Sequence, residues 1–190
     1  TSSFEVGFND FYLIKVDFNG NEQWSQYYGG GNHDILYAVK ETNDGGYIAT
    51  GSTKSYGNGN LPDIWVIKVD SEGNEIWNNY FGGEYDDEGF DIIQTQDAGY
   101  AIVGFHKDWH ATYGWEWDIV LLKIDNSGEQ LWQRIISSEY DDVYENAFSL
   151  LETSDGSLVL SGRQYDIGES ANVLLLKTDS EGTEVWTKTF

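Results

Sequence analysis

Apolar and polar residues alternate in short runs along the whole chain, and clusters of Gly, Asn and Asp separate these runs. In residues 31–83 the runs fall at 37–42, 47–50, 64–69 and 75–81. Runs of about four to eight residues that are rich in β-branched and aromatic side chains are typical of β-strands. The turn residues between them are typical of hairpins. The pattern therefore predicts four short antiparallel strands in this stretch.

A motif that recurs four times sets the period of the chain. It consists of Lys, one residue, Asp, two residues, Gly, three residues and Trp. The four copies carry Lys15, Lys68, Lys123 and Lys177 and end at Trp24, Trp77, Trp132 and Trp186. Successive tryptophans are 53, 55 and 54 residues apart. Four strands in each unit of this length predict an all-β fold built from β-propeller blades.

The repeat divides the chain into about three and a half blades. Residues 1–30 supply only the last two strands of a blade, and complete units follow at 31–83, 84–138 and 139–190. Propellers close with about four to eight blades, so the sequence predicts a partial propeller. We expect the ring to be completed by further blades of a longer chain, by another protein or by a second copy. The absence of Met at position 1 favours a segment of something longer.

Composition narrows the choice of partners. The net charge is -23, with 33 acidic against 10 basic residues. Such a surface repels phosphate backbones, so we expect no nucleic acid partner. No apolar run approaches the roughly 20 residues of a membrane span, so no direct membrane insertion is expected. The 8 Trp, 13 Tyr and 9 Phe are enough to cover a core, which places the acidity on the surface of a folded protein.

The repeated motif resembles that of known propellers. Segment 68–77, Lys-Val-Asp-Ser-Glu-Gly-Asn-Glu-Ile-Trp, is followed by Tyr-Phe-Gly-Gly at 80–83 and resembles the tryptophan-docking repeat of quinoprotein-like propellers. Segments 42–51 and 63–70 resemble repeats of large secreted β-propeller proteins of Bacteroidetes and some archaea. The resemblance implies that each repeated Trp packs on the neighbouring blade. It also implies an extracellular or cell-surface location.

The repeated Lys and Asp residues are interpreted as scaffold. An active site is singular, whereas these lysines recur in every unit, and flanking Asp residues are expected to hold them in ion pairs. The Asp-x-x-Gly segments are shorter than an EF-hand loop, so tight-turn chemistry is favoured over calcium binding there.

Calcium binding is a weaker possibility at the acidic segments between units. The sequence does not require any cofactor. Glu84, Asp86 and Asp87 cluster beside one boundary between units, and Asp141 and Asp142 cluster beside the next. Several carboxylates suit a hard cation that prefers oxygen ligands. The alternative is that these are solvated acidic loops without a ligand.

The most distinctive stretch without a counterpart in the other units is 105–117. It occupies the variable loop expected between the second and third strands of its unit. Its candidate ligand-binding residues are Trp109, His110, Tyr113, Trp115 and Trp117. Exposed aromatic rings can stack on sugar faces, and recognition sites commonly lie on loops. The alternative is that Trp115 and Trp117 continue into the following strand and only pack there.

No enzyme signature is present in the sequence, and no catalytic residue is proposed. It contains no Gly-x-Ser-x-Gly, no His-Glu-x-x-His, no P-loop and no Gly-x-Gly-x-x-Gly. We therefore expect a non-catalytic extracellular or cell-surface module for binding, adhesion or assembly with a protein partner. One alternative is a carbohydrate-binding module that uses residues 105–117. The other is part of a propeller enzyme, either a glycoside hydrolase or a quinoprotein.

Overall fold

The computed structural model describes residues 10–57, 61–110, 114–137, 143–166 and 170–190. Within these residues the protein is all-β, with one two-stranded and three four-stranded antiparallel sheets. The two-stranded sheet contains β1 (Phe11–Val16) and β2 (Glu22–Tyr28). The second sheet contains β3 (Asp34–Glu41), β4 (Tyr47–Thr53), β5 (Asp63–Val69) and β6 (Glu75–Phe81). The third contains β7 (Asp87–Gln94), β8 (Tyr100–His110), β9 (Gly114–Ile124) and β10 (Gln130–Ile136), and the fourth contains β11 (Val143–Glu152), β12 (Leu158–Asp166), β13 (Asn172–Thr178) and β14 (Glu184–Thr189).

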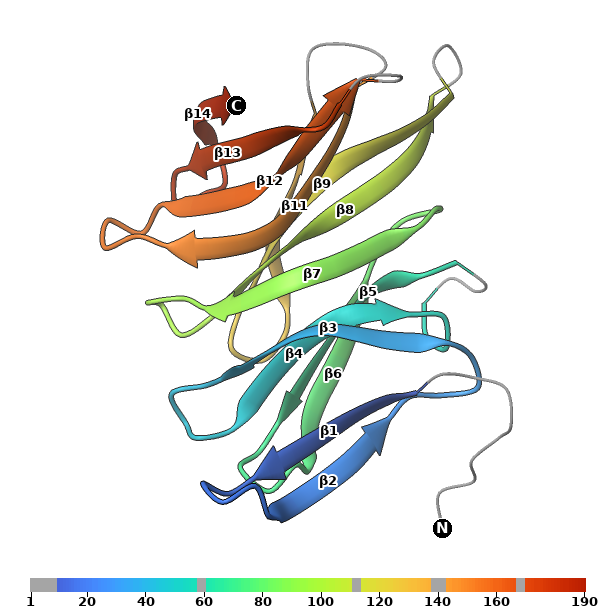
Figure 1. Cartoon of the computed structure of the whole chain (residues 1–190), viewed down its shortest axis with the longest axis vertical. Coiled ribbons are helices and arrows are strands. Elements are labelled where there is room, and N and C mark those ends of the chain that lie inside the picture. Colours follow the sequence, from blue (N-terminus) through green and yellow to red (C-terminus); the bar gives the residue numbers. More distant parts are fainter. Residues whose placement is uncertain (1–9, 58–60, 111–113, 138–142, 167–169) are drawn as a thin grey trace.

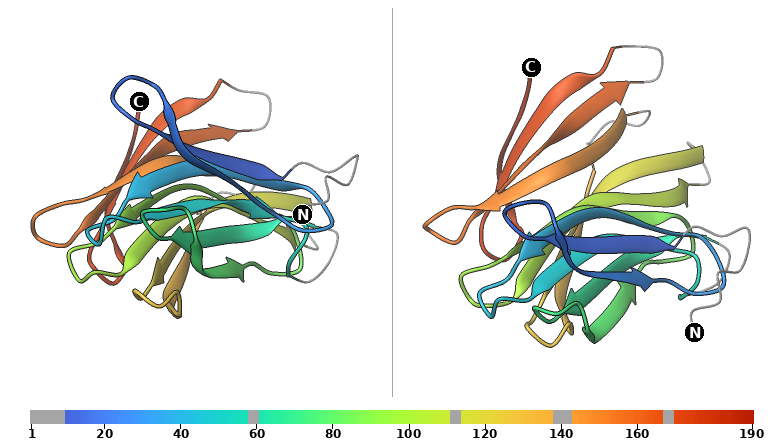
Figure 2. Two further views of the ribbon diagram at one scale, coloured as in Figure 1. Left: turned by 90° about the horizontal axis from the view of Figure 1, so that it is seen from below. Right: turned by 60° about the horizontal axis from the view of Figure 1, so that its bottom comes forward.

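In every sheet the strands follow one another in chain order, and the sheets stack face to face (Figure 1). The strands β3, β7 and β11 contact one another across successive sheets, and seen from below the sheets open like a fan (Figure 2). The β1–β2 sheet lies at one end of the array and β11–β14 at the other. This confirms the predicted fold class, a partial β-propeller with about three and a half blades. The described part of the chain contains no helix long and apolar enough to cross a membrane.

The first strand of the second sheet begins earlier than the sequence pattern predicts. It starts at Asp34 rather than at residue 37. The Asp34 side chain is buried and accepts hydrogen bonds from the Thr53 hydroxyl and from the Gly30 N–H. A charged residue at this position looked like part of a loop, but its hydrogen bonds anchor the strand.

A backbone bulge explains one of the glycines that recur in the repeat. The pairing of the first two strands in each four-stranded sheet shifts register by one residue, as between Gly89 and Asp91. A Cβ on the facing Gly104 would collide with the carbonyl oxygen of Glu88. Gly51 and Gly162 face the same obstacle in their own sheets. Only glycine allows the two backbones to approach so closely.

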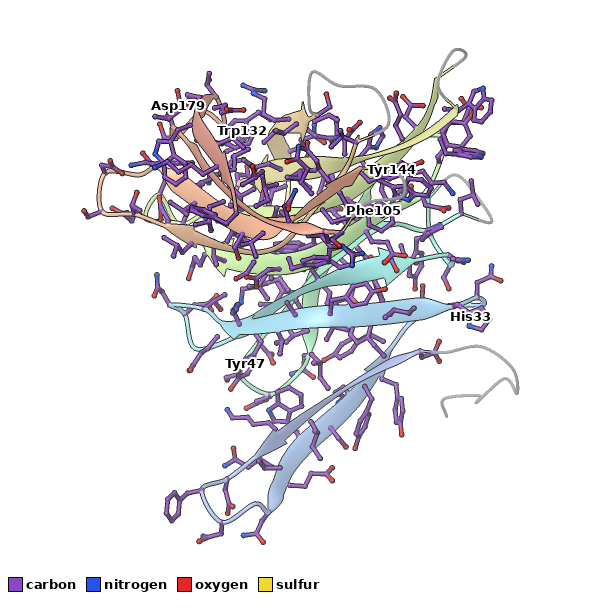
Figure 3. All side chains as sticks on the ribbon, turned by 45° about the horizontal axis from the view of Figure 1, so that its top comes forward. His33, Tyr47, Phe105, Trp132, Tyr144 and Asp179 are labelled. Carbon is purple, nitrogen blue, oxygen red and sulfur yellow. The ribbon has the colours of Figure 1, made fainter. Side chains whose placement is uncertain are left out.

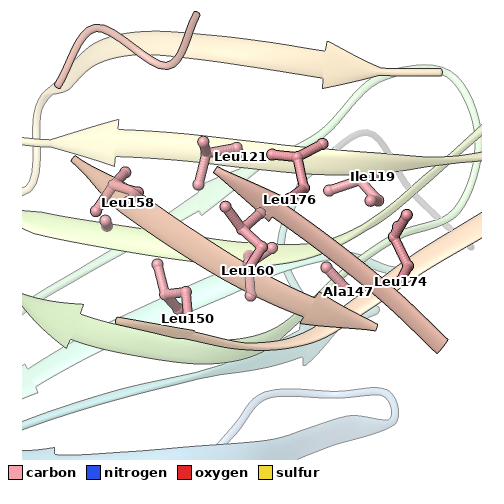
Figure 4. Close-up of a cluster of buried hydrophobic side chains, with 10 residues drawn as sticks. Ile119, Leu121, Ala147, Leu150, Leu158, Leu160, Leu174 and Leu176 are labelled. Carbon is pink, nitrogen blue, oxygen red and sulfur yellow. The ribbon is translucent and has the colours of Figure 1, made fainter. Parts of the chain in front are cut away.

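The hydrophobic core lies between successive sheets rather than at one centre. Figure 4 shows the cluster between the third and fourth sheets, which contains Ile119, Leu121, Ala147, Leu150, Leu158, Leu160, Leu174 and Leu176. Similar clusters join the second sheet to the third and the first sheet to the second. Burial of one such large side chain contributes about 1.5–3 kcal/mol. Each sheet is therefore stabilised mainly by its neighbours, as in other repeat proteins.

Candidate functional site

Each blade is joined to the next by a tryptophan ring that packs on a turn. The repeated Trp lies on the last strand of its sheet, and its indole lies against the Gly of the Asp-x-x-Gly turn in the following sheet. The three pairs are Trp24 with Gly73, Trp77 with Gly128, and Trp132 with Gly182. These glycines have φ angles of +82°, +89° and +77°. Glycine is therefore required both for the backbone conformation and for the space that the indole fills.

Hydrogen bonds accompany this packing. The Trp24 Nε1–H donates to the carbonyl oxygen of Ser71 at 2.9 Å, and the Tyr28 hydroxyl donates to the Gly73 carbonyl. One sheet further on, the Asn79 amide donates to the carbonyl oxygen of Gly128 at 2.9 Å. Figure 3 shows Trp132 beside the turn that begins at Asp179. At the first two joints the last strand of the blade thus contacts the next turn through both a ring and polar groups.

The Asp residues of these segments form the turns themselves. In each segment the carboxylate accepts hydrogen bonds from the backbone N–H groups two and four residues later, as Asp17 does from residues 19 and 21. Asp70, Asp125 and Asp179 make the same pair of bonds. The Asn21 side chain and then these N–H groups lower the pKa of Asp17. The segments are therefore tight turns, as the sequence predicted.

The repeated lysines pair with a different Asp from the one expected. Lys68 Nζ lies 3.0 Å from Asp44, which belongs to the turn between the first two strands of the same sheet. Lys123 pairs with Asp97 at 2.9 Å and Lys177 pairs with Asp155 at 3.2 Å. The expectation of a flanking partner was wrong, because the Asp two residues after each Lys is already used by its own turn. The Thr42 hydroxyl, the Gly46 N–H and Lys68 together lower the pKa of Asp44 to about 2.

Lys15 stands apart from the other three lysines. The β1–β2 sheet has no first hairpin among the described residues, and therefore no Asp turn beside Lys15. Its Nζ lies 3.4 Å from the Ser71 carbonyl oxygen and 5.3 Å from the centre of the Tyr47 ring instead. Lys15 thus contacts the next blade, whereas its counterparts stabilise their own.

Grooves recur beside the lysine pairs. One of about 450 Å³ is lined by Lys68, Asp44 and Trp77, and one of about 320 Å³ is lined by Lys123 and Asp97. Both lie between neighbouring blades at the same place in the repeat. Because the grooves recur with the scaffold, neither is singled out as a functional site.

The face of β1 that points away from the array is exposed, unlike the same face in every later blade. Ile14 on β1 is 51% exposed. The residues at the same position of β5, β9 and β13 are Ile67 at 1%, Leu122 at 0% and Leu176 at 1%. In the later blades this position is covered by the preceding blade. Tyr12 and Val16 on the same face of β1 are also exposed.

The opposite end of the array shows the complementary exposure. Val173 on β13 is 56% exposed, whereas Ile64 and Ile119 at the same position of β5 and β9 are 1% and 0% exposed. Phe190 lies four residues after Trp186 and is exposed. Tyr28 lies four residues after Trp24, at the same repeat position, and is buried. We call the first surface the leading face (Tyr12, Ile14, Val16) and this one the trailing face (Val173, Trp186, Phe190).

The aromatic stretch 105–117 is an extended hairpin rather than the loop that was expected. Strands β8 and β9 continue beyond the rest of their sheet and pair Trp109 with Trp115 and Lys107 with Trp117. The sequence pattern missed this extension because Gly and charged residues interrupt its alternation. Tyr113 lies outside the described residues, and His110 is the last residue of β8.

The two exposed tryptophans of this hairpin lie together. Trp109 and Trp115 are 50% and 41% exposed, and their ring centres are 5.0 Å apart. The ammonium group of Lys107 lies 4.5 Å from the centre of the Trp115 ring. Trp117 instead packs on Tyr144 of the fourth sheet at 4.6 Å. Two of the five candidate residues, Trp109 and Trp115, are thus brought together, whereas Trp117 packs against the neighbouring blade.

The opposite face of the hairpin is acidic. His106 Nδ1 lies 2.5 Å from Asp87 Oδ1, and this hydrogen bond raises the pKa of His106. Burial, and then the negative charge of Glu116, raise the pKa of Asp118 to about 6. No local sequence pattern predicts this cluster, because it forms only when β7, β8 and β9 pair.

Three of the five acidic residues named as candidate calcium ligands, Glu84, Asp86 and Asp87, lie in the described part of the chain. Asp86 pairs with Lys107 at 3.1 Å, while Asp87 binds His106 and accepts the Gly83 N–H at 2.7 Å. Glu84 is exposed, and Asp141 and Asp142 lie outside the described residues. Within the described ranges, no three side chains of His, Cys, Asp or Glu gather as a metal site would require.

Replacement of a docked tryptophan should cost far more than replacement of an undocked one. We expect Trp77→Ala to lower the free energy of unfolding by about 3 kcal/mol, because it empties the space beside Gly128. Trp186→Ala in dilute protein should change it by at most about 0.5 kcal/mol. Urea denaturation followed by tryptophan fluorescence measures both. Equal losses would show that docking does not hold the blades together.

Asp118 should make stability fall as the pH rises. The folded protein keeps this carboxyl protonated up to about pH 6, whereas the unfolded chain releases the proton near 3.8, so stability is lost between these values. Asp118→Asn, which copies Asn172 at the same repeat position, should gain about 1–2 kcal/mol at neutral pH, after a discount for solvent screening, and little near pH 4. Urea denaturation across this pH range measures the gain. A gain independent of pH would contradict the assignment.

Comparison with known proteins adds no argument on fold or function. No protein-family model matches the chain, and no curated protein matches its sequence. Among solved structures, it is similar to a protein of unknown function from Bacteroides caccae, whose crystal structure was determined at 1.35 Å resolution. The identity is 12%, the match covers 93% of this chain and 74% of the other, and the TM-score is 0.49. A likeness at this level carries no information on function.

Proposed function

We propose that this chain is a non-catalytic β-propeller module that assembles with a protein partner through the two ends of its blade array. The observation that carries the proposal is the contrast in exposure at equivalent positions, 51% for Ile14 against 1% for Ile67. An apolar side chain that is buried in every other unit favours a partner surface of similar shape. Burial of each such side chain would contribute about 1.5–3 kcal/mol to binding before the costs of association.

The partner surface that fits best is itself a blade. In the later sheets, the positions equivalent to the leading face are covered by the preceding blade. In the second and third sheets, the positions equivalent to the trailing face are covered by the following blade. Further blades of a longer chain, another propeller protein or a second copy would all supply such a surface. The proposal includes an extracellular or cell-surface location, which is supported by the resemblance of the repeats to those of secreted proteins.

A scaffold role accounts for the ionisable residues that recur in the repeat. Lys68 and Asp44 bind each other, and Asp70 closes a turn. These roles recur at the same positions of the other blades. Periodic use of this kind supports assembly rather than catalysis. No observation favours a glycoside hydrolase or a quinoprotein, and both stay alternatives from the sequence alone.

Hydroxyl-radical footprinting of the assembly from its natural source tests the proposal. We expect Ile14 and Val173 to be protected in that assembly and reactive in the purified chain. Ile76 on β6, which is 55% exposed within the array, is the internal control and should react equally in both. Equal reactivity of Ile14 and Val173 in both samples would remove the proposed function.

A second candidate function is carbohydrate binding on the β8–β9 hairpin. The specific observation is the pair Trp109 and Trp115, which form an exposed aromatic surface with a cation beside it. Aromatic faces of this kind suit the apolar faces of sugar rings. Lys107, whose ammonium group lies 4.5 Å from the centre of the Trp115 ring, is close enough to contact the hydroxyl groups of a bound sugar. Trp109 and Trp115 are opposite each other in the paired strands β8 and β9, so the surface needs little ordering on binding.

Glycan-array binding of single-site variants tests this second function. We expect wild-type protein to bind a subset of neutral glycans, and Trp109→Ala to weaken that binding at least about tenfold, a loss of about 1.4 kcal/mol. Tyr80→Ala removes an equally exposed ring from β6 and serves as the matched control, which should bind as wild type does. Equal binding by the Trp109 variant would exclude the hairpin as a glycan site.

A further inference from the structure

One of the four Asp-x-x-Gly turns holds no tryptophan. Gly20 has the same backbone conformation as the other turn glycines, with φ of +83°, but apart from its chain neighbours no described residue has an atom within 4 Å of where its Cβ would be. At Gly73 an indole occupies this space. The turn at Gly20 is therefore a docking surface of known geometry that no described tryptophan covers.

At the other end of the array, one tryptophan has no turn. Trp186 pairs with Lys177 across β13 and β14 in the register that places Trp77 opposite Lys68. No Asp-x-x-Gly turn of the described chain contacts it, and the ring has Lys188 beside it at 5.9 Å. The residue is thus positioned as its docked counterparts are, but without the surface on which they pack.

Apolar side chains surround both unfilled positions. Phe18 occupies the second position of the Gly20 turn and is fully exposed. The same position of the other three turns holds a polar residue, namely Ser71, Asn126 or Ser180. The leading face lies on the strand that precedes this turn, and Trp186 itself belongs to the trailing face with Val173 and Phe190. Each surface therefore extends the apolar contact that a docked tryptophan would begin.

We propose that two copies of this chain associate head to tail, with Trp186 of one copy packed on the Gly20 turn of the other. This rests on the proposed function, because it names the occupant of the end faces. The Trp186 Nε1–H then donates to the Phe18 carbonyl oxygen, as Trp24 does to Ser71 within one chain. Lys188 takes the place of Asn79 and donates to the carbonyl oxygen of Gly20.

Contacts between outer strands are enough to hold such a joint. The β1–β2 sheet consists of outer strands alone, and it is joined to the second sheet through Trp24, Tyr28 and the core residues Phe11 and Leu13. The proposed joint uses the equivalent strands of two copies. Because the two faces differ, the contact is heterologous and produces closed rings or open chains.

Electrostatics predicts a salt dependence for this association. Each copy has a net charge of -23, so two copies repel each other at low ionic strength. Salt screens this repulsion, while the apolar contact is not weakened by it. Self-association should therefore strengthen as sodium chloride is raised.

Sedimentation velocity of the purified chain tests the proposal, over a concentration series at low and high sodium chloride. Gly20→Asn places a side chain where the indole would lie, and Asn tolerates the left-handed backbone conformation. Gly45→Asn is the matched control, because Gly45 has φ of +81° and equally open space but lies in a turn that receives no tryptophan. We expect wild type and Gly45→Asn to associate alike, and Gly20→Asn and Trp186→Ala to remain monomers.

The outcomes separate this inference from the proposed function. If the wild-type chain stays monomeric throughout the series, a second copy is not the occupant of the end faces. The proposal also fails if Gly20→Asn associates as wild type does. The footprint of the natural assembly then decides the proposed function by itself. If Ile14 and Val173 are protected there, the end faces bind a different blade. Circular dichroism of each variant confirms that loss of association is not loss of folding.

Discussion

The contact between an indole and the glycine of the next turn is the interaction on which this architecture depends. Neighbouring sheets share apolar side chains over most of their faces, but such surfaces can slide past one another. The ring of Trp77 against Gly128, with Asn79 bonded to the same glycine, fixes the position of one blade on the next. Because each blade contacts mainly its neighbours, this local joint sets the geometry of the whole array.

The features that recur in every unit could be predicted from the sequence. A period of about fifty residues, four runs per period and turns rich in Gly and Asp were sufficient to predict the sheets and their order. The strand at 75–81 was placed correctly because Glu75 and Gly82 mark its ends. The start of β3 was not, because the burial of Asp34 depends on hydrogen bonds to residues about twenty positions away.

Interactions between residues far apart in the chain could not be predicted from the sequence. Lys68 and Asp44 are 24 residues apart, and nothing local indicates that this Asp is chosen over Asp70. The acidic cluster around Asp118 arises only from strand pairing, as does the meeting of Trp109 with Trp115. The sequence predicted that the array is incomplete, but not which side chains form its end faces. Ile14 and Ile67 look alike there, and only the neighbouring sheet distinguishes them.

The equivalence of the joints between blades has a consequence for how such a chain can change in length. Trp24, Trp77 and Trp132 meet turns of the same form, so every internal boundary is interchangeable with every other. Duplication or deletion of one whole unit would leave both new neighbours with a contact that already exists in the fold. Blade number can therefore vary in single genetic steps without a new interface.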